Sequence, residues 1–112
     1  MLIQEYNQYA QKEYTEITFS PEQEERICRR ISGDSIVKLE LVKTCIELII
    51  KLARWYSVEN SVPFPQLIQI GIRAVVKGAE DFCNSGDAGF VDYLYGEVMR
   101  AMIKYSRPYS SN

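Results

Sequence analysis

The sequence predicts an all-α protein, a compact helical bundle of about four to five helices. Apolar residues recur at spacings of three and four along most of the chain, which is the period of an amphipathic helix. Residue types that start and stop helices separate these segments. With 112 residues, 46% of them apolar and 25% charged, the chain is long enough to bury a core as one domain spanning residues 1–112.

The first part of this domain, residues 1–18, is expected to be an N-terminal arm or helix. Apolar and tyrosine residues spaced by three and four favour a helix over residues 2–14. The core, residues 19–106, begins with a strong helix start: Ser20 is placed to cap the N–H of Gln23, and Pro21 lies in the first turn. Gly33 stops this helix, and Asp34 or Ser35 caps the next one.

The longest predicted helix covers residues 35–56. In its first half we expect Ile36, Leu39 and Val42 to face inward. Its second half is apolar around most of its circumference, which is typical of a central helix with neighbours on several sides. The polar residues 57–62 are expected to end it.

Two further helices follow a Pro-Phe-Pro segment. The first covers residues 65–82, with an inward stripe formed by Leu67, Ile68, Gly71, Val75, Ala79 and Phe82. A glycine-bearing loop at residues 84–89 leads to the last helix, residues 90–105, and Pro108 is expected to end it.

Composition excludes several classes of function. The formal net charge of −2 gives no overall positive field for nucleic acid, so any such contact must come from a local patch. The sequence contains no histidine, phosphate-binding glycine loop or paired-carboxylate motif, so we expect neither an enzyme nor a cofactor or metal site. Cys28, Cys45 and Cys83 are odd in number and far apart, which favours reduced thiols in the cytoplasm.

Membrane insertion and secretion are not expected either. The longest apolar-rich run, residues 45–53, is interrupted by Glu47 and Lys51 and is too short to span a bilayer. The N-terminal residues lack the basic and apolar regions of a secretory signal.

From Ser20 onward, the order of motifs resembles regions 1.2 and 2 of the sigma-70 family of bacterial transcription initiation factors. The likeness is carried by the segments FSPEQEERICRRISGD, LIIKLARWY, FPQLIQIGIRAVVKGAEDF and GFVDYLYGEVMRAMI. The Leu-Ile-Gln-x-Gly motif at residues 67–71 and the Phe-x-x-Tyr motif at residues 90–93 align together with almost no gaps. The resemblance therefore implies a cytoplasmic bundle similar to sigma region 2.

The resemblance also implies two binding surfaces. The first docks on a coiled coil of the β′ subunit of RNA polymerase, and matches Gln66, Leu67, Gln69, Ile70, Ile72 and Arg73. The second holds bases flipped out of the promoter −10 element, and matches Phe90, Tyr93, Arg100, Lys104 and Arg107. Aromatic stacking on bases and cations beside phosphates suit this second role.

Departures from the family pattern leave alternatives open. The paired tryptophans of the family are replaced by Gly96 and Glu97, and polar docking positions are replaced by Ile70 and Ile72. One alternative is a sigma-like interaction module that binds polymerase, a sigma or anti-sigma protein, or itself, without melting DNA. Another is a solvated helix face with nothing bound. The sequence has no counterpart of sigma region 4, so recognition of a complete promoter would require a partner chain that supplies one, unless the sequence is part of a longer protein.

Overall fold

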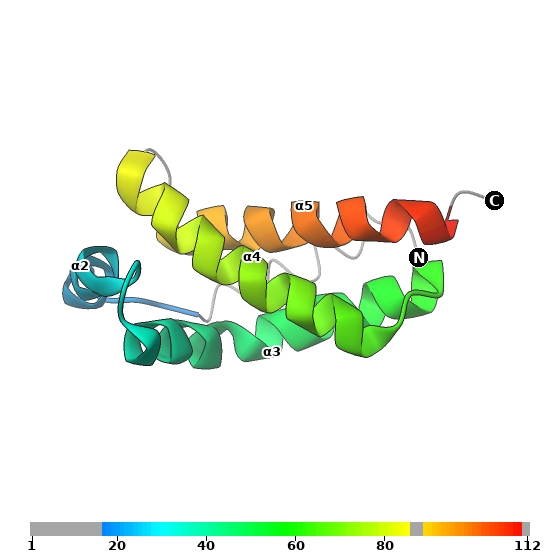
Figure 1. The fold of residues 1–112 in the computed structure, drawn as a ribbon, viewed down its shortest axis with the longest axis horizontal. Coiled ribbons are helices and arrows are strands. Elements are labelled where there is room, and N and C mark those ends of the chain that lie inside the picture. The colour runs from blue at the N-terminus through cyan, green and yellow to red at the C-terminus, as the bar shows by residue number, and fades with distance from the viewer. Residues whose placement is uncertain (1–16, 86–88, 111–112) are drawn as a thin grey trace.

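The computed structural model describes residues 17–85 and 89–110, with side chains for residues 17–83 and 89–107. This part of the chain is a compact all-α bundle, as predicted. Its helices are α2 (Pro21–Arg30), α3 (Ser35–Asn60), α4 (Phe64–Ser85) and α5 (Phe90–Ser110). The three long helices run along the bundle, with α4 between α3 and α5, and α2 lies at one end (Figure 1). The helix predicted at residues 2–14 lies outside the described residues.

Capping residues place the starts of α2 and α3 as the sequence predicts. The N–H of Gln23 donates to Ser20 Oγ at 3.1 Å, and the N–H of Ser20 donates to Gln23 Oε1 at 2.7 Å, which completes the capping box. Of the two candidates for the next cap, Asp34 is the one used: its Oδ1 accepts from the N–H of Ile36 at 2.9 Å. Local hydrogen bonding therefore defines both helix starts.

The inward face predicted for the first half of α3 is wrong. Ile36 and Leu39 are 65% and 59% exposed, and Val42 is half-buried. Val37, Leu41 and Cys45 are buried instead. These three residues continue the apolar stripe of the second half of the helix, where α4 and α5 pack. One continuous stripe therefore faces the neighbouring helices, and the other apolar residues are left on the outside.

All three long helices run further than predicted. Helix α3 continues through residues 57–60 to Asn60, because polar residues on an exposed helix end do not break it, and Ser61 then turns the chain with φ 56°. Helix α4 continues beyond residue 82 to Ser85. Helix α5 passes Pro108 and reaches Ser110. Pro108 falls in the last turn, where the loss of one N–H from the helical hydrogen-bond ladder and the crowding by the ring disturb only the end of the helix.

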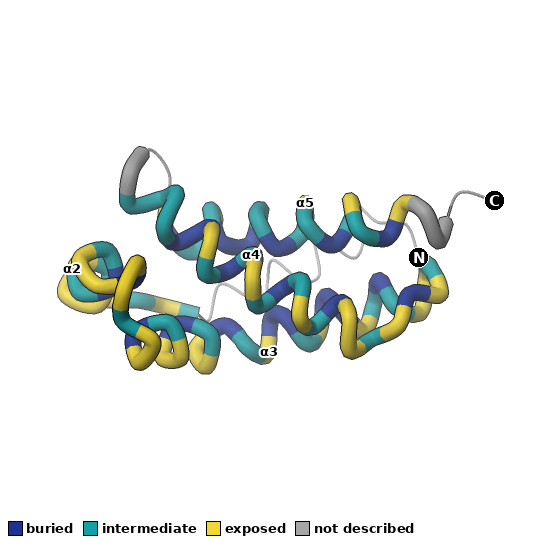
Figure 2. The backbone as a smooth tube through the Cα atoms, in the orientation of Figure 1, coloured by how far each residue is buried: buried dark blue, intermediate teal, exposed yellow. Residues whose placement is uncertain are grey.

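The inward stripe predicted for α4 is confirmed and forms the centre of the core. Leu67, Val75 and Ala79 are fully buried, and Ile68 and Phe82 pack against the core. The three long helices pack tightly together at Gly71, where an added Cβ would lie 2.7 Å from Ile49 Cγ2 and 2.9 Å from Met102 Cε. The buried positions follow the inner side of all three helices (Figure 2).

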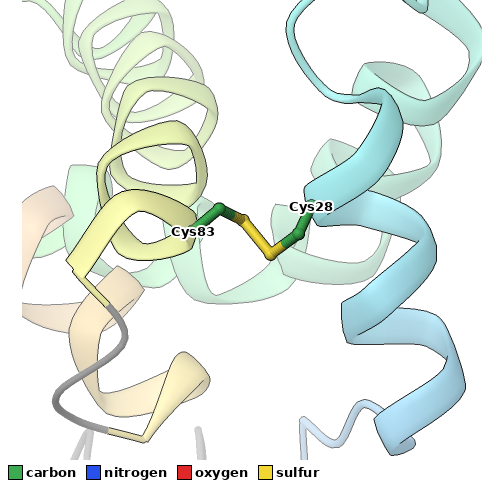
Figure 3. The surroundings of a disulfide bond; sticks show 2 residues. All are labelled: Cys28 and Cys83. Atoms are coloured by element: carbon green, nitrogen blue, oxygen red, sulfur yellow. A yellow bond between two sulfur atoms is a disulfide. The ribbon is translucent and has the colours of Figure 1, made fainter.

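The prediction of reduced thiols is wrong for two of the three cysteines. Cys28 on α2 and Cys83 on α4 form a disulfide, with their Cα atoms 5.3 Å apart (Figure 3). Although 55 positions separate them in sequence, packing of α2 beside the end of α4 brings them together. Cys45 is a free, buried thiol in the core. Among the described residues, no helix is long and apolar enough to cross a membrane.

Candidate binding surfaces on α4 and α5

A groove between α4 and α5 is the main concave feature of the predicted binding surfaces. It has a volume of about 720 Å³ and is open to solvent. Its lining residues come from one face of each helix and are Ile70, Arg73, Ala74, Lys77, Ala101, Lys104 and Tyr105. On each helix the lining residues are spaced by three or four positions in sequence, so they lie along one face of that helix. The hydroxyl of Tyr105 donates a hydrogen bond to Gln66 Oε1, which joins the two helices beside this groove.

The rim of the groove is positively charged. Arg73, Lys77 and Lys104 line it together, and no carboxylate does. Lys77 pairs with Asp81, with 3.7 Å between Nζ and Oδ2. Arg73 and Lys104 make no ion pair with any residue that the structure describes. A chain with a net charge of −2 therefore carries a local cationic patch around an apolar floor.

The residues predicted to bind polymerase divide into two groups. Gln66, Gln69 and Arg73 are exposed, and Ile70 lines the groove. Ile72 is half-buried against the core, and Leu67 is 0% exposed. A partner can thus contact the first four residues directly, whereas Leu67 supports the surface from beneath.

The sequence reasoning missed several groove residues. Ala74 and Lys77 follow Ile70 at spacings of four and seven, so the helical period itself contained a signal for them. Ala101 and Tyr105 lie on the other helix, and only the packing of α5 on α4 brings them to the same groove.

Two aromatic residues predicted to bind bases lie in different environments. Phe90 is 3% exposed, and its ring centroid lies 5.0 Å from those of both Phe19 and Phe82. The ring of Phe90 is therefore packed in the core and is not exposed for stacking on a base. Tyr93 is half-buried, with its ring centroid 5.7 Å from that of Phe82. Tyr93 is the aromatic candidate that keeps solvent contact.

The basic residues of α5 share a helical face but are not equally available. Arg100 Nη2 lies 2.9 Å from Glu97 Oε1. The missing side chain of Gly96 leaves room for this guanidinium, whose Nη1 is 3.3 Å from the position of an added Cβ. Lys104 and Arg107 are exposed on the same face. The sequence analysis predicted that these cations share one helical face, but it did not predict the ion pair between Glu97 and Arg100. Their spacing of three positions was a signal for it, because residues three apart are neighbours on a helix surface.

Among the described residues, three titrating groups have a shifted pKa, and none of them is a predicted site residue. Burial raises the pKa of Cys45 to about 12, and burial also raises the pKa of Tyr95. A side-chain hydrogen bond with Glu40 raises the pKa of Arg26. In the part of the chain that the structure describes, no three His, Cys, Asp or Glu residues are grouped so that they could hold a metal ion.

Comparison with known proteins found no matching family model, no matching curated protein and no matching solved structure.

Proposed function

We propose that this chain is a non-catalytic, sigma-like module of bacterial transcription initiation, acting in the cytoplasm, whose first partner is the RNA polymerase core. The observation that carries this proposal is the α4–α5 groove. It places Ile70 and Arg73, which the sigma resemblance assigns to polymerase docking, beside Lys104 of α5. An apolar floor with a cationic rim is suited to a protein surface that combines apolar and acidic side chains.

A binding experiment with charge-reversal variants tests this role. Purified RNA polymerase core, immobilised, is titrated with the protein and with Arg73→Glu and Lys104→Glu. Both side chains are exposed and lack an ion pair among the described residues, so reversal replaces attraction by repulsion without breaking an internal contact. We expect each variant to weaken binding about tenfold or more, which corresponds to about 1.4 kcal/mol.

Lys43→Glu is the matched control, since Lys43 is an exposed lysine on α3 outside the groove. It makes the same change in net charge and should alter binding less than twofold. Equal losses in all three variants would point to a general charge effect. No binding of the unaltered protein to the polymerase core would refute the proposal. Binding to an isolated sigma or anti-sigma protein, or self-association, would then support the alternative interaction module.

A second candidate function is binding of single-stranded −10-type DNA by α5. Support comes from the continuous helix, which runs past Arg107 to Ser110 and keeps Tyr93, Lys104 and Arg107 at helical spacing on one face. The pairing of Arg100 with Glu97 and the burial of Phe90 count against strong binding. For these reasons we place DNA second to a protein partner.

Fluorescence anisotropy with a single-stranded −10-type oligonucleotide tests the DNA candidate. Tyr93→Ala removes a stacking ring and should cost roughly 1–3 kcal/mol of binding, whereas Tyr93→Phe keeps the ring and should cost much less. Glu97→Gln releases Arg100 from its carboxylate partner and should tighten binding. Absence of binding at low salt, or binding indifferent to Tyr93→Ala, would remove DNA from the proposed function.

A further inference from the structure

The disulfide between Cys28 and Cys83 is, apart from the peptide chain itself, the only covalent link between α2 and the long helices among the described residues. Both bonded cysteines are half-buried residues. Their surroundings contrast with those of Cys45, which is buried and whose pKa is raised to about 12 by that burial. The three cysteines thus divide into a half-buried, bonded pair and one buried thiol of low reactivity.

Few other contacts hold α2 in place. Ile27 and Ile31 bury their side chains in the core beside α3 and α4. An ion pair joins Arg26 to Glu40 of α3, but both side chains are largely exposed and such pairs contribute little. The link between Cys28 and Cys83 is therefore a large part of what keeps α2 against the end of α4.

The disulfide also adjoins the aromatic residues that support Tyr93. Phe82 precedes Cys83 and contacts the rings of Phe90 and Tyr93 at centroid distances of 5.0 and 5.7 Å. On the other side, Phe19 lies just before α2 and contacts Phe90 edge-on at 5.0 Å. The cluster of Phe19, Phe82, Phe90 and Tyr93 thus joins the segment before α2 and the end of α4 to the first turns of α5.

We propose that Cys28 and Cys83 form a reversible redox link that controls how firmly α2 and this aromatic cluster hold the start of α5. The inference rests on the proposed function in one respect: the controlled surface is the candidate nucleic-acid face, and a cytoplasmic protein meets a thiol-reducing environment. In the reduced state α2 is held by its apolar contacts and the exposed Arg26–Glu40 ion pair. In the oxidised state the link fixes α2, Phe82 and Tyr93 as one unit.

Thiol–disulfide exchange with a small-molecule disulfide, such as oxidised glutathione, closes the link. The thiolate of one cysteine attacks the glutathione disulfide and releases one reduced glutathione. The second cysteine then displaces the other glutathione as the protein S–S bond forms. The two protein thiols are oxidised, the glutathione disulfide is reduced to two thiols, and a dithiol such as dithiothreitol reverses the process.

Counting reactive thiols in the folded protein tests the first half of the proposal. After treatment with dithiothreitol, a maleimide should label two thiols rapidly, and after treatment with oxidised glutathione it should label none rapidly. Cys45→Ser should keep this pattern, whereas Cys28→Ser/Cys83→Ser should show no rapid labelling in either state. Rapid labelling of two thiols after the oxidising treatment would overturn the proposal.

Hydrogen–deuterium exchange, read by mass spectrometry in both redox states, tests the second half. The amides of residues 27–30 and 93–99 should exchange about tenfold or more faster in the reduced protein, while those of residues 48–52 in the buried middle of α3 should not change. The double variant should match the reduced protein under both treatments. Equal exchange at residues 27–30, or at residues 93–99, in the two states would overturn the proposal. Neither readout uses DNA or polymerase, so failure of the redox link and failure of the proposed function are separate outcomes.

Discussion

Replacement of Gly71 by alanine tests whether the close contact of the three long helices depends on this glycine. An alanine Cβ would lie 2.7 Å from Ile49 Cγ2 and 2.9 Å from Met102 Cε. The flexible end of Met102 can move aside, but Ile49 is β-branched, fully buried and has few alternative rotamers. The helices must therefore separate slightly to admit one methyl group.

Two opposing effects set the size of the change. Alanine is favoured over glycine inside a helix by about 1 kcal/mol. Overpacking a tightly packed core costs about 1–3 kcal/mol. The contact with Ile49 is well below van der Waals distance and Ile49 is rigid, so the overpacking cost lies in the upper part of its range. After subtraction of the helix-propensity gain, we expect Gly71→Ala to lower the free energy of unfolding by about 1–2 kcal/mol.

Gly96→Ala is the matched control. The added Cβ there lies 3.3 Å from the guanidinium nitrogens of Arg100, which belong to an exposed, flexible side chain. This variant should keep most of the helix-propensity gain and raise stability by about 0.5–1 kcal/mol. Urea unfolding followed by circular dichroism, with the redox state held constant, measures both changes. A Gly71→Ala protein as stable as the unaltered protein would refute the packing argument, as would an equal loss in Gly96→Ala.

Three further predictions concern stability. Ser20→Ala removes the capping oxygen of α2 and should lower the free energy of unfolding by about 1 kcal/mol in urea titrations, whereas Ser20→Asp should restore most of it. Leu67→Ala should lower the free energy of unfolding by about 2–5 kcal/mol because Leu67 is fully buried. Gln69→Ala changes an exposed residue of the same helix and should alter this free energy by no more than about 0.5 kcal/mol. Similar losses in both variants would contradict the assignment of Leu67 to the core. The thiol of Cys45 has a pKa near its ordinary 9.0 in the unfolded chain and about 12 in the folded protein. The contribution of Cys45 to the free energy of unfolding should be constant below pH 9.0 and should fall by up to about 1.4 kcal/mol per pH unit between the two pKa values, because the unfolded chain loses the thiol proton first. Cys45→Ala should remove this part of the pH dependence of unfolding. An identical dependence of the unfolding free energy on pH in both proteins would show that Cys45 does not contribute.

Features that depend on neighbouring residues could be predicted from the sequence. The capping box of Ser20 and Gln23 and the inward stripe of α4 are as expected, and the cap of α3 is Asp34, one of the two candidates. Each of them follows from hydrogen bonds or helical periodicity within a few turns of one helix. Helix ends were less predictable, because the polar residues after Tyr56 continue the exposed end of α3 and Pro108 is accommodated in the last turn of α5.

Features that depend on which helices meet could not be predicted in the same way. The first half of α3 carries apolar residues on two sides, and the positions of α2 and α4 decide that Val37 and Leu41 are buried while Ile36 and Leu39 are exposed. Likewise, the odd number of cysteines favoured free thiols, yet packing of α2 near the end of α4 pairs Cys28 with Cys83.

The candidate site illustrates the same division. Local patterns were enough to predict the all-α class, the helix starts and the residue types on one face of α4 and of α5, because these depend on helical period and local hydrogen bonds. The packing of the helices against one another was needed to show that Ile70, Arg73 and Lys104 share one groove, and that Phe90 belongs to the core. The rotation of each helix about its axis follows from burying the largest apolar area against its neighbours, which no single helix specifies.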